Sequence, residues 1–383
     1  MNMTIARTDN SLLGHWWWSV DKLMLSALGL LILAGVILIA ASSTAIAERL
    51  HEPSFYFVLK HLFYLVPTFG LIFGISLMSP KTIRRTASII FLVSLAMLAL
   101  VPVVGSEHNG AQRWISLGGF SVQPSEFIKP SFAVVAAWLF SSQHRDHGFP
   151  GYLISCGLCA LIVGLLLLQP DLGMTVVVSL VWAAQFFVAG LPLSVVAILF
   201  VLGVTGLFGI YMTFPHVTSR IDRFLDPQKG DTYQVDRSLE AFQHGGFFGT
   251  GPGQGEIKRV LPDAHADFIF AVSGEEFGLV LTIGLVFLYG FIIWRGMQRI
   301  RNCENLFVML AVSGLLVQFG GQALIHMGSS LRLLPAKGMT LPLISYGGSS
   351  QIAICVTAGF ILALTRHRPE KRAQERSFFR SPA

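Results

Sequence analysis

The chain has 383 residues, of which 53% are hydrophobic and only 13% are charged. A soluble domain carries about 25% charged residues, so this composition excludes an ordinary soluble protein. The formal net charge of +6 does not indicate nucleic-acid binding, because the basic residues gather in short loops and in the C-terminal segment. That distribution is typical of membrane proteins, whose orientation it sets.

Apolar stretches long enough to cross a bilayer, which takes about 20 residues, recur along the chain and predict an all-α polytopic membrane protein. The first is expected at 22–47. Its apolar run, Leu23–Ala41, is longer than the core of a signal peptide, about 7–15 residues, so we expect a retained helix. Nine further helices are expected at 55–78, 86–104, 126–142, 150–168, 174–190, 193–214, 268–294, 305–327 and 342–365.

The distribution of Lys and Arg predicts the orientation of these helices. With both termini in the cytoplasm, the basic clusters at 79–85 and 295–304 and in the C-terminal tail lie inside, as the positive-inside rule requires. The polar segments 105–125, 169–173 and 215–267 then lie outside. Loops longer than about 12–15 residues usually carry function or are disordered, so 215–267 is the expected functional loop. We therefore divide the chain into an N-terminal segment (1–21), one membrane domain (22–366) and a basic tail (367–383).

The end of the long outer loop carries a carboxylate where the sequence becomes apolar. Asp263 follows Pro262 at a predicted helix start, and Asp267 lies one turn further on. The two acids could simply cap this helix and complement its dipole. Alternatively, Asp267 is a general base, made a better base by partial desolvation beside Phe268 and Phe270.

The same loop contains a glycine-rich stretch at 245–255. Gly249 and Gly251 follow no predicted strand, and no P-loop Lys-Ser/Thr accompanies them, so a nucleotide-binding fingerprint is excluded. The backbone N–H groups could cradle the phosphate of an anionic head group. Glycines in a tight extracellular turn are the alternative.

Charged residues also lie at the edges of other predicted helices. Glu126 and Lys129 are spaced i,i+3 and could simply pair. Charges at the edge of a membrane helix are nevertheless functional candidates, and the same holds for Asp171. The segment 334–350 contains two prolines and three glycines, which predicts an irregular backbone bordering a polar cleft, with Lys337 as an anion contact.

Five motifs, in this order, resemble those of the bacterial SEDS family (shape, elongation, division and sporulation). They are Arg113-Trp114-Ile115, Gln123-Pro124-Ser125-Glu126, Gln169-Pro170-Asp171-Leu172-Gly173, His265-x-Asp267-Phe268-Ile269-Phe270 and Pro342-x-Ile344-Ser345-Tyr346-Gly347-Gly348-Ser349-Ser350. The resemblance extends from roughly residue 20 to residue 366. The stretches 16–21 and 235–242 are most similar to the cell-division members of the family, and the elongation members are the nearest alternative.

This resemblance implies a peptidoglycan glycosyltransferase that polymerises lipid II on the outer face of the bacterial inner membrane, at the division septum, and releases undecaprenyl pyrophosphate. It implies Asp267 as the catalytic carboxylate. The substrate-binding residues are expected to be Arg113, Lys129, Lys337, Glu126, His265 and Ser345. It also implies a divalent cation (Mg²⁺ or Mn²⁺, with unidentified ligands) and a class B penicillin-binding protein, an FtsI-like transpeptidase, as partner together with other division proteins.

The chain departs from the family pattern at two positions, and two other functions stay open. Ala266 stands where the family commonly has Thr, and His326 where Asn is frequent. Broken helices with intramembrane charges also suit a transporter that flips lipid II. A scaffold that only recruits a synthase is the second alternative. We see no inverted repeat, and a carboxylate on a long outer loop favours chemistry.

Overall fold

The structure is a computed structural model. It describes residues 11–49, 51, 53, 55–108, 111–117, 120–190, 193–213, 215–226, 232–335 and 338–367.

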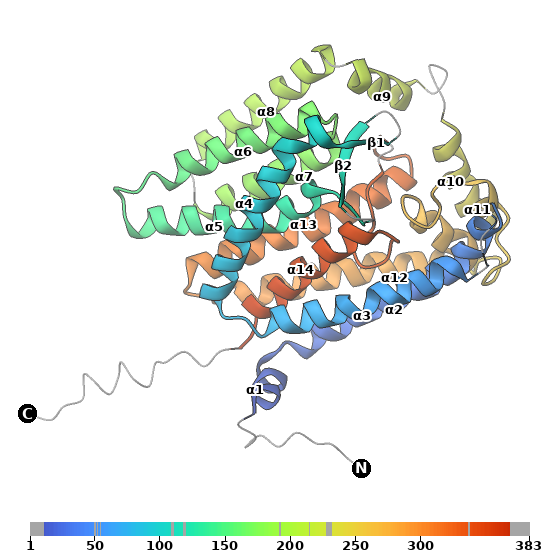
Figure 1. Cartoon of the computed structure of the whole chain (residues 1–383), viewed down its shortest axis with the longest axis horizontal. Coiled ribbons are helices and arrows are strands. Elements are labelled where there is room, and N and C mark those ends of the chain that lie inside the picture. The colour runs from blue at the N-terminus through green and yellow to red at the C-terminus, as the bar shows by residue number, and fades with distance from the viewer. Residues whose placement is uncertain are drawn as a thin grey trace, which may run out of the picture.

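Every apolar segment predicted to cross the membrane contains a helix (Figure 1). The helices are α2 (Lys22–Arg49), α3 (Tyr56–Ser76), α4 (Pro80–Val104), α5 (Pro124–Arg145), α6 (Gly151–Leu168), α7 (Leu172–Val188), α8 (Leu193–Thr213), α12 (Ile269–Ile300), α13 (Leu306–Ser330) and α14 (Gly348–Leu364). Within the described residues, six of them are long and apolar enough to span a membrane unaided: α2, α3, α4, α6, α12 and α13. α7 and α14 are shorter apolar helices. The predicted all-α polytopic architecture is confirmed.

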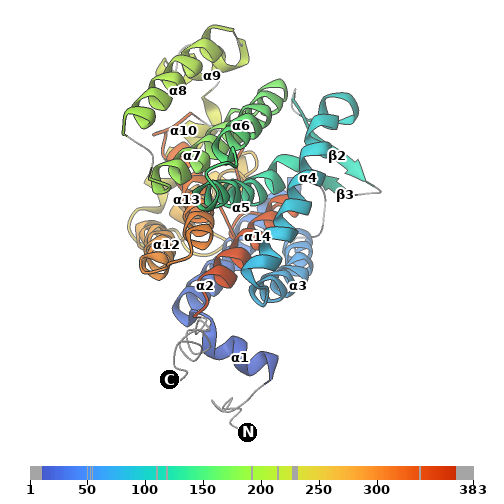
Figure 2. The same cartoon turned by 90° about the vertical axis from the view of Figure 1, so that its left-hand side faces the viewer.

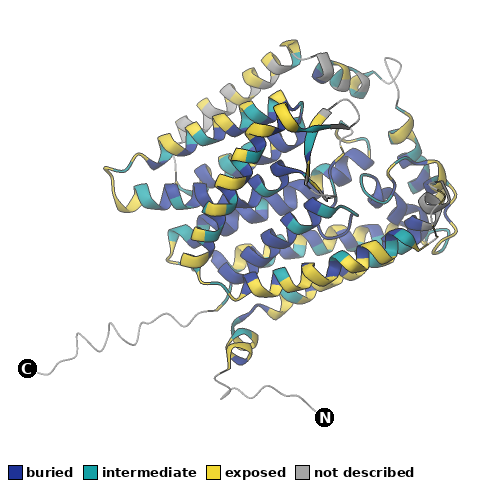
Figure 3. Cartoon of the chain, in the orientation of Figure 1, coloured by how far each residue is buried: buried dark blue, intermediate teal, exposed yellow. Residues whose placement is uncertain are grey.

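Helix α5 lies at the centre of the bundle, between α4, α7, α13 and α14 (Figure 2). Most of its side chains are buried, including Glu126 and Lys129. Ala133, Ala136 and Ala137 are fully buried, and such small residues let neighbouring helices approach closely. The peripheral helices are buried on their inner sides only, and residues on their outer sides are exposed (Figure 3). Many of these exposed residues are large and apolar, and lipid would cover them.

Secondary structure also forms in segments where the sequence analysis predicted only polar loops. The segment 105–125 folds into an antiparallel sheet of order β1-β2-β3, with strands β1 (Ser106–His108), β2 (Ala111–Leu117) and β3 (Phe120–Val122). The long outer loop contains α9 (Pro215–Leu225), α10 (Tyr233–Gly245) and α11 (Ile257–Val260), and α1 (Leu12–Ser19) precedes the first span. Because α10 packs along α12, the loop is folded onto the bundle rather than extended from it.

Two predicted spans differ from the structure. The predicted helix 268–294 is interrupted, because Gly278 has φ 73° and ψ −169°, which is not helical. A Cβ at Gly278 would lie 2.4 Å from both the Gly249 nitrogen and the Phe247 carbonyl oxygen, so the break depends on glycine. The predicted helix 342–365 begins only at Gly348, and the segment 338–347 before it has no helix, as its proline and two glycines indicate.

The two ends of the described chain lie together. The His367 N–H donates to the Ser19 carbonyl oxygen at 2.8 Å, which joins the end of α14 to the end of α1. Both ends therefore lie on the same side of the bundle, as an even number of spans requires. Which side faces the cytoplasm stays a prediction.

Candidate functional site

Two motifs far apart in the sequence pack against each other around Asp267. The Ser345 hydroxyl donates to the Ala266 carbonyl oxygen at 2.6 Å and accepts from the Leu341 N–H at 2.7 Å. The Tyr346 N–H donates to the His265 carbonyl oxygen at 3.0 Å. The irregular segment before α14 thus holds the turn that carries Asp267, and the hydroxyl of Ser345 serves that backbone contact.

The Asp267 carboxylate has the properties of a base that works at neutral pH. Its side chain is partly buried and faces Gly338, where an added Cβ would lie 2.8 Å from Oδ2. In the described part of the chain, no hydrogen bond or ion pair to this carboxylate is found. Burial, reinforced by the negative charge of Asp263, raises the pKa of Asp267 to about 7. A general base is most effective when its pKa lies near the working pH.

The capping part of the alternative interpretation of these two acids is wrong, whereas the interaction of Asp267 with the helix dipole stays a prediction. The N-cap residue of α12 is Phe268, and no side chain caps that helix. Asp263 adopts a left-handed conformation with φ 50°, and its carbonyl oxygen, not its carboxylate, accepts the Asp267 N–H at 2.9 Å. Neither carboxylate is therefore used in capping.

The imidazole of His265 lies beside this carboxylate turn, between two aromatic rings. Its ring centroid is 5.2 Å from that of Phe57 and 5.3 Å from that of Tyr346. Burial lowers the pKa of His265, although Asp263 opposes the shift. Within the residues that the structure describes, the buried Nδ1 atom has no hydrogen-bond partner.

Arg113 joins strand β2 to the turn before α7. Its Nε donates to the Gln169 carbonyl oxygen at 3.2 Å, and its Nη2 donates to the Pro170 carbonyl oxygen at 2.6 Å. The Asp171 carboxylate lies 3.8 Å from Nε and caps α7 by accepting the Met174 N–H. Two motifs that the sequence presents separately therefore form one contact.

Lys129 and Glu126 pair, as their spacing allows. The Lys129 Nζ atom lies 2.9 Å from Glu126 Oε2, and the lysine and the glutamate are only 1% and 3% exposed. Nζ also donates to Gln322 Oε1 at 2.7 Å, and Gln322 Nε2 donates to the Thr340 carbonyl oxygen at 3.0 Å. The pair thereby reaches the segment that faces Asp267. Lys337 lies outside the described residues.

His326, one of the departures from the family pattern, supports the same segment. Its Nδ1 lies 2.6 Å from the Met339 carbonyl oxygen, which can only accept, so Nδ1 carries the proton. Gln322 and His326 of α13 thus hold Thr340 and Met339 next to Gly338. This fixes the backbone against which the Asp267 carboxylate lies.

A buried ionic cluster that the sequence did not reveal lies beside the glycine-rich stretch, and its contacts decide between the two interpretations of that stretch. Thr250 and Gly251 donate their N–H groups to the main-chain carbonyls of Glu275 and Glu276, and Gly253 donates to the Glu276 carboxylate. These N–H groups are occupied, so the phosphate-cradle interpretation is wrong. The signal was present: two adjacent glutamates inside an apolar segment are functional candidates.

The sequence resemblance implies a divalent cation, but the described residues contain no cluster of protein ligands for one. No group of three or more His, Cys, Asp or Glu side chains there lies close enough to hold a metal ion. Mg²⁺ is often held by only one or two carboxylates, with substrate phosphates and water completing the shell. The described residues therefore leave most of the ligand shell of such a cation to substrate phosphates and water.

Comparison with known proteins identifies the family. Residues 21–370 match the family model of the FtsW, RodA and SpoVE cell cycle proteins. The probable peptidoglycan glycosyltransferase FtsW of Caulobacter vibrioides is 42% identical over 365 residues, which cover 95% of this chain and 94% of that protein. The probable peptidoglycan glycosyltransferase FtsW of Saccharophagus degradans is 36% identical, covering 88% of this chain and 90% of that protein.

Solved structures agree with this match. A chain of a peptidoglycan synthase complex that coordinates polymerization and crosslinking superposes with a TM-score of 0.75 at 29% identity, covering 92% of this chain and all of that chain (100%). The rod shape determining protein RodA of Thermus thermophilus superposes with a TM-score of 0.67 at 28% identity, covering 91% of this chain and 97% of that chain. The protein is thus a multi-pass membrane glycosyltransferase that belongs to the SEDS family of FtsW, RodA and SpoVE cell cycle proteins.

Proposed function

We propose that this protein polymerises lipid II into glycan strands during septal cell-wall synthesis and releases undecaprenyl pyrophosphate. The relatives named FtsW, which align over nearly their whole lengths, support the peptidoglycan substrate. The observation that carries the proposal is the carboxylate of Asp267, whose pKa is raised to about 7 at the junction of the outer loop and α12.

In the proposed reaction, Asp267 takes the proton from the 4-hydroxyl of the acceptor disaccharide. The hydroxyl oxygen attacks the anomeric carbon of the donor and forms the new glycosidic bond. The bond between that carbon and the pyrophosphate oxygen breaks with inversion, and the pyrophosphate leaves with the electron pair. General-base catalysis contributes about 10²–10⁴-fold to such a step.

We assign the remaining site residues to binding of the substrate. Arg113, Lys129 and Lys337 would attract the pyrophosphate, since electrostatic stabilisation of a leaving anion is often the largest catalytic effect. Glu126 holds the Lys129 ammonium in place at 2.9 Å. His265 would hydrogen-bond the sugar or peptide, and Ser345 would fix the turn. A divalent cation would be held mainly by the substrate phosphates, and would lower the charge of the leaving group.

The proposed setting is the division septum of the bacterial inner membrane. The loop 215–267 would face outward, both termini would lie in the cytoplasm, and a class B penicillin-binding protein would crosslink the strands. The similarity to a chain of a peptidoglycan synthase complex supports such a partner. The similarity to RodA leaves an elongation role as the alternative.

The test compares Asp267→Asn with Asp263→Asn in a lipid II polymerisation assay on purified protein with its partner. Asp267→Asn keeps the size of the side chain and removes the base, so we expect polymerisation to fall at least about 10²-fold. Asp263→Asn should retain most activity, because Asn tolerates the left-handed conformation that Asp263 adopts. Full activity of both variants would move the base elsewhere. Transport of lipid II without formation of polymer would indicate a flippase. Absence of both activities would indicate a scaffold.

A further inference from the structure

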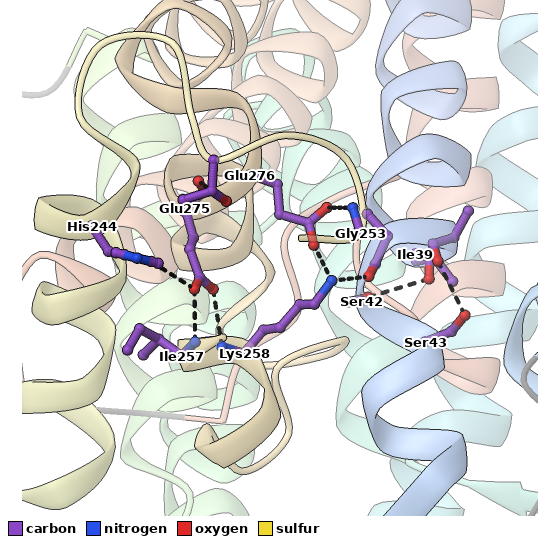
Figure 4. Close-up of polar contacts among 12 residues, drawn as sticks. Ile39, Ser42, Ser43, His244, Gly253, Ile257, Lys258, Glu275 and Glu276 are labelled. Carbon is purple, nitrogen blue, oxygen red and sulfur yellow. Dashed lines mark hydrogen bonds and ion pairs between the residues drawn. The ribbon is translucent and has the colours of Figure 1, made fainter. Parts of the chain in front are cut away.

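A buried ionic cluster lies at the break in α12, outside the residues assigned to the reaction (Figure 4). Glu275 and Glu276 are 0% and 1% exposed, and Lys258 is 1% exposed. Lys258 lies in α11 of the outer loop, and the two glutamates lie in α12, against which that loop packs. Burying charges is costly unless each is paired and hydrogen-bonded, so a cluster of this kind needs a structural or functional reason.

Glu275 binds the backbone of α11. Its Oε1 accepts the Ile257 N–H at 2.7 Å, and its Oε2 accepts the Lys258 N–H at 2.9 Å. The His244 Nδ1 of α10 lies 3.3 Å from Oε1. Both carboxylate oxygens are therefore used as acceptors, which an amide side chain could not reproduce, because one of its two positions is a donor.

Glu276 makes the second attachment. Its Oε1 pairs with the Lys258 ammonium, and its Oε2 accepts the Gly253 N–H at 3.1 Å. The same ammonium donates to the Ala41 carbonyl oxygen at 2.8 Å. The buried lysine thus joins α11 to α12 and to α2, and Glu276 also binds the glycine-rich stretch.

These contacts close a ring in the chain that contains Asp267. From Lys258 the chain runs through the turn at 261–268, which includes Asp267, and enters α12 at Ile269. It returns within two helical turns to Glu275 and Glu276, which bind the start of the segment. The segment that carries Asp267 is therefore anchored at both ends.

We propose that Glu275 and Glu276 are positioning residues for catalysis, which close the Asp267-bearing segment onto the outer part of α12 and hold the base in its partly buried place. This inference rests on the proposed role of Asp267 as the base. Without the contacts of these two glutamates, the segment would sample other conformations and the Asp267 carboxylate would become more exposed to solvent. Misplacement of a catalytic group by about 1 Å can cost about 10²-fold in rate.

The test uses Glu275→Gln and Glu276→Gln in the full-length protein, each of which exchanges one acceptor oxygen for a donor at nearly constant shape. The pH dependence of polymerisation is measured beside turnover. By the same positioning argument, we expect turnover at pH 8 to fall by about 10-fold or more. We also expect the acidic limb of the profile to move down by about one pH unit or more, because a solvated aspartate has a pKa of about 3.9.

The matched control is Glu240→Gln on α10, which breaks an ion pair to Arg237 in the same loop, where both side chains are well exposed at 44% and 38%. This variant should change neither the turnover nor the position of the acidic limb of the pH profile. Backbone amide exchange at Ile257 and Lys258 gives a second readout, and it should accelerate in Glu275→Gln. If a single variant does not fold, the double variant Lys258→Met with Glu276→Gln is used instead. It removes both charges of the pair, so no unpaired charge stays buried, and the same measurements are made on it.

A loss of turnover with an unchanged limb would overturn the inference, since the cluster would then only stabilise the fold. Wild-type turnover in both glutamate variants would overturn it as well. Asp267→Asn is measured in the same series. If that variant is fully active, the proposed base is wrong. If it is inactive but the acidic limb does not move in the glutamate variants, Asp267 remains the base and only the positioning role of the glutamates is wrong.

Discussion

Replacing the proposed base should make the protein more stable as well as inactive. Asp267 is held partly buried, and burial raises its pKa from 3.8 to about 7. The folded protein therefore binds this proton more tightly than the unfolded chain does. By linkage, the free energy of unfolding of the wild type falls as pH rises from about 4 to about 7. Asp267→Asn removes this titration.

The size of the effect follows from the shift. At about 1.4 kcal/mol per pKa unit, the change from 3.8 to about 7 corresponds to about 4 kcal/mol above pH 7. Partial exposure and solvent screening reduce this to roughly 1–2 kcal/mol. The free energy of unfolding of Asp267→Asn should exceed that of the wild type by a small amount at pH 5 and by the full amount at pH 8. Such a trade of stability for activity is common at active sites.

The assay is thermal unfolding of purified wild type and variant in one detergent, followed by tryptophan fluorescence at pH 5, 6, 7 and 8. The difference between the unfolding midpoints is plotted against pH, with Glu240→Gln, a change at an exposed carboxylate of the same loop, as the control. A midpoint difference that does not change with pH would refute the reasoning. So would a variant that is less stable than the wild type at pH 8.

The remaining predictions concern pH, charge pairs and topology. With a base of pKa about 7, wild-type polymerisation should fall about tenfold from pH 8 to pH 6, measured as initial rates, and a flat profile would contradict the assignment. Lys129→Met should lower the unfolding midpoint by leaving Glu126 unpaired, a cost of about 3–5 kcal/mol, and adding Glu126→Gln should restore the fold but not the polymerisation. Arg113→Ala should weaken use of lipid II in membranes where the protein is still inserted; wild-type turnover would make Arg113 structural. A cysteine replacing Phe248 should react with an impermeant reagent from outside and one replacing Gln298 should not, and the reverse pattern would invert the topology.

The site residues show how far the motifs reach. Sequence reasoning placed Asp267 at the junction of loop and helix, and the structure adds the neighbouring Gly338 and the raised pKa. The pairing of Glu126 with Lys129 was one of two alternatives, and only the structure shows that the pair is buried and bonded to Gln322. Capping by Asp263 was wrong because local spacing cannot reveal a backbone that turns through a left-handed residue.

The amino-acid sequence by itself determined the spans, because crossing a bilayer depends on the length and hydropathy of one continuous segment. It also determined which motifs to compare with known families. The tertiary structure decided the break at Gly278, the folding of 215–267 onto the bundle and the attachment of Glu275 and Glu276 to α11. These features depend on close approach and hydrogen bonding between segments distant in sequence. Buried backbone and side-chain polar groups must find partners, and which partner each one finds is fixed only when the helices pack.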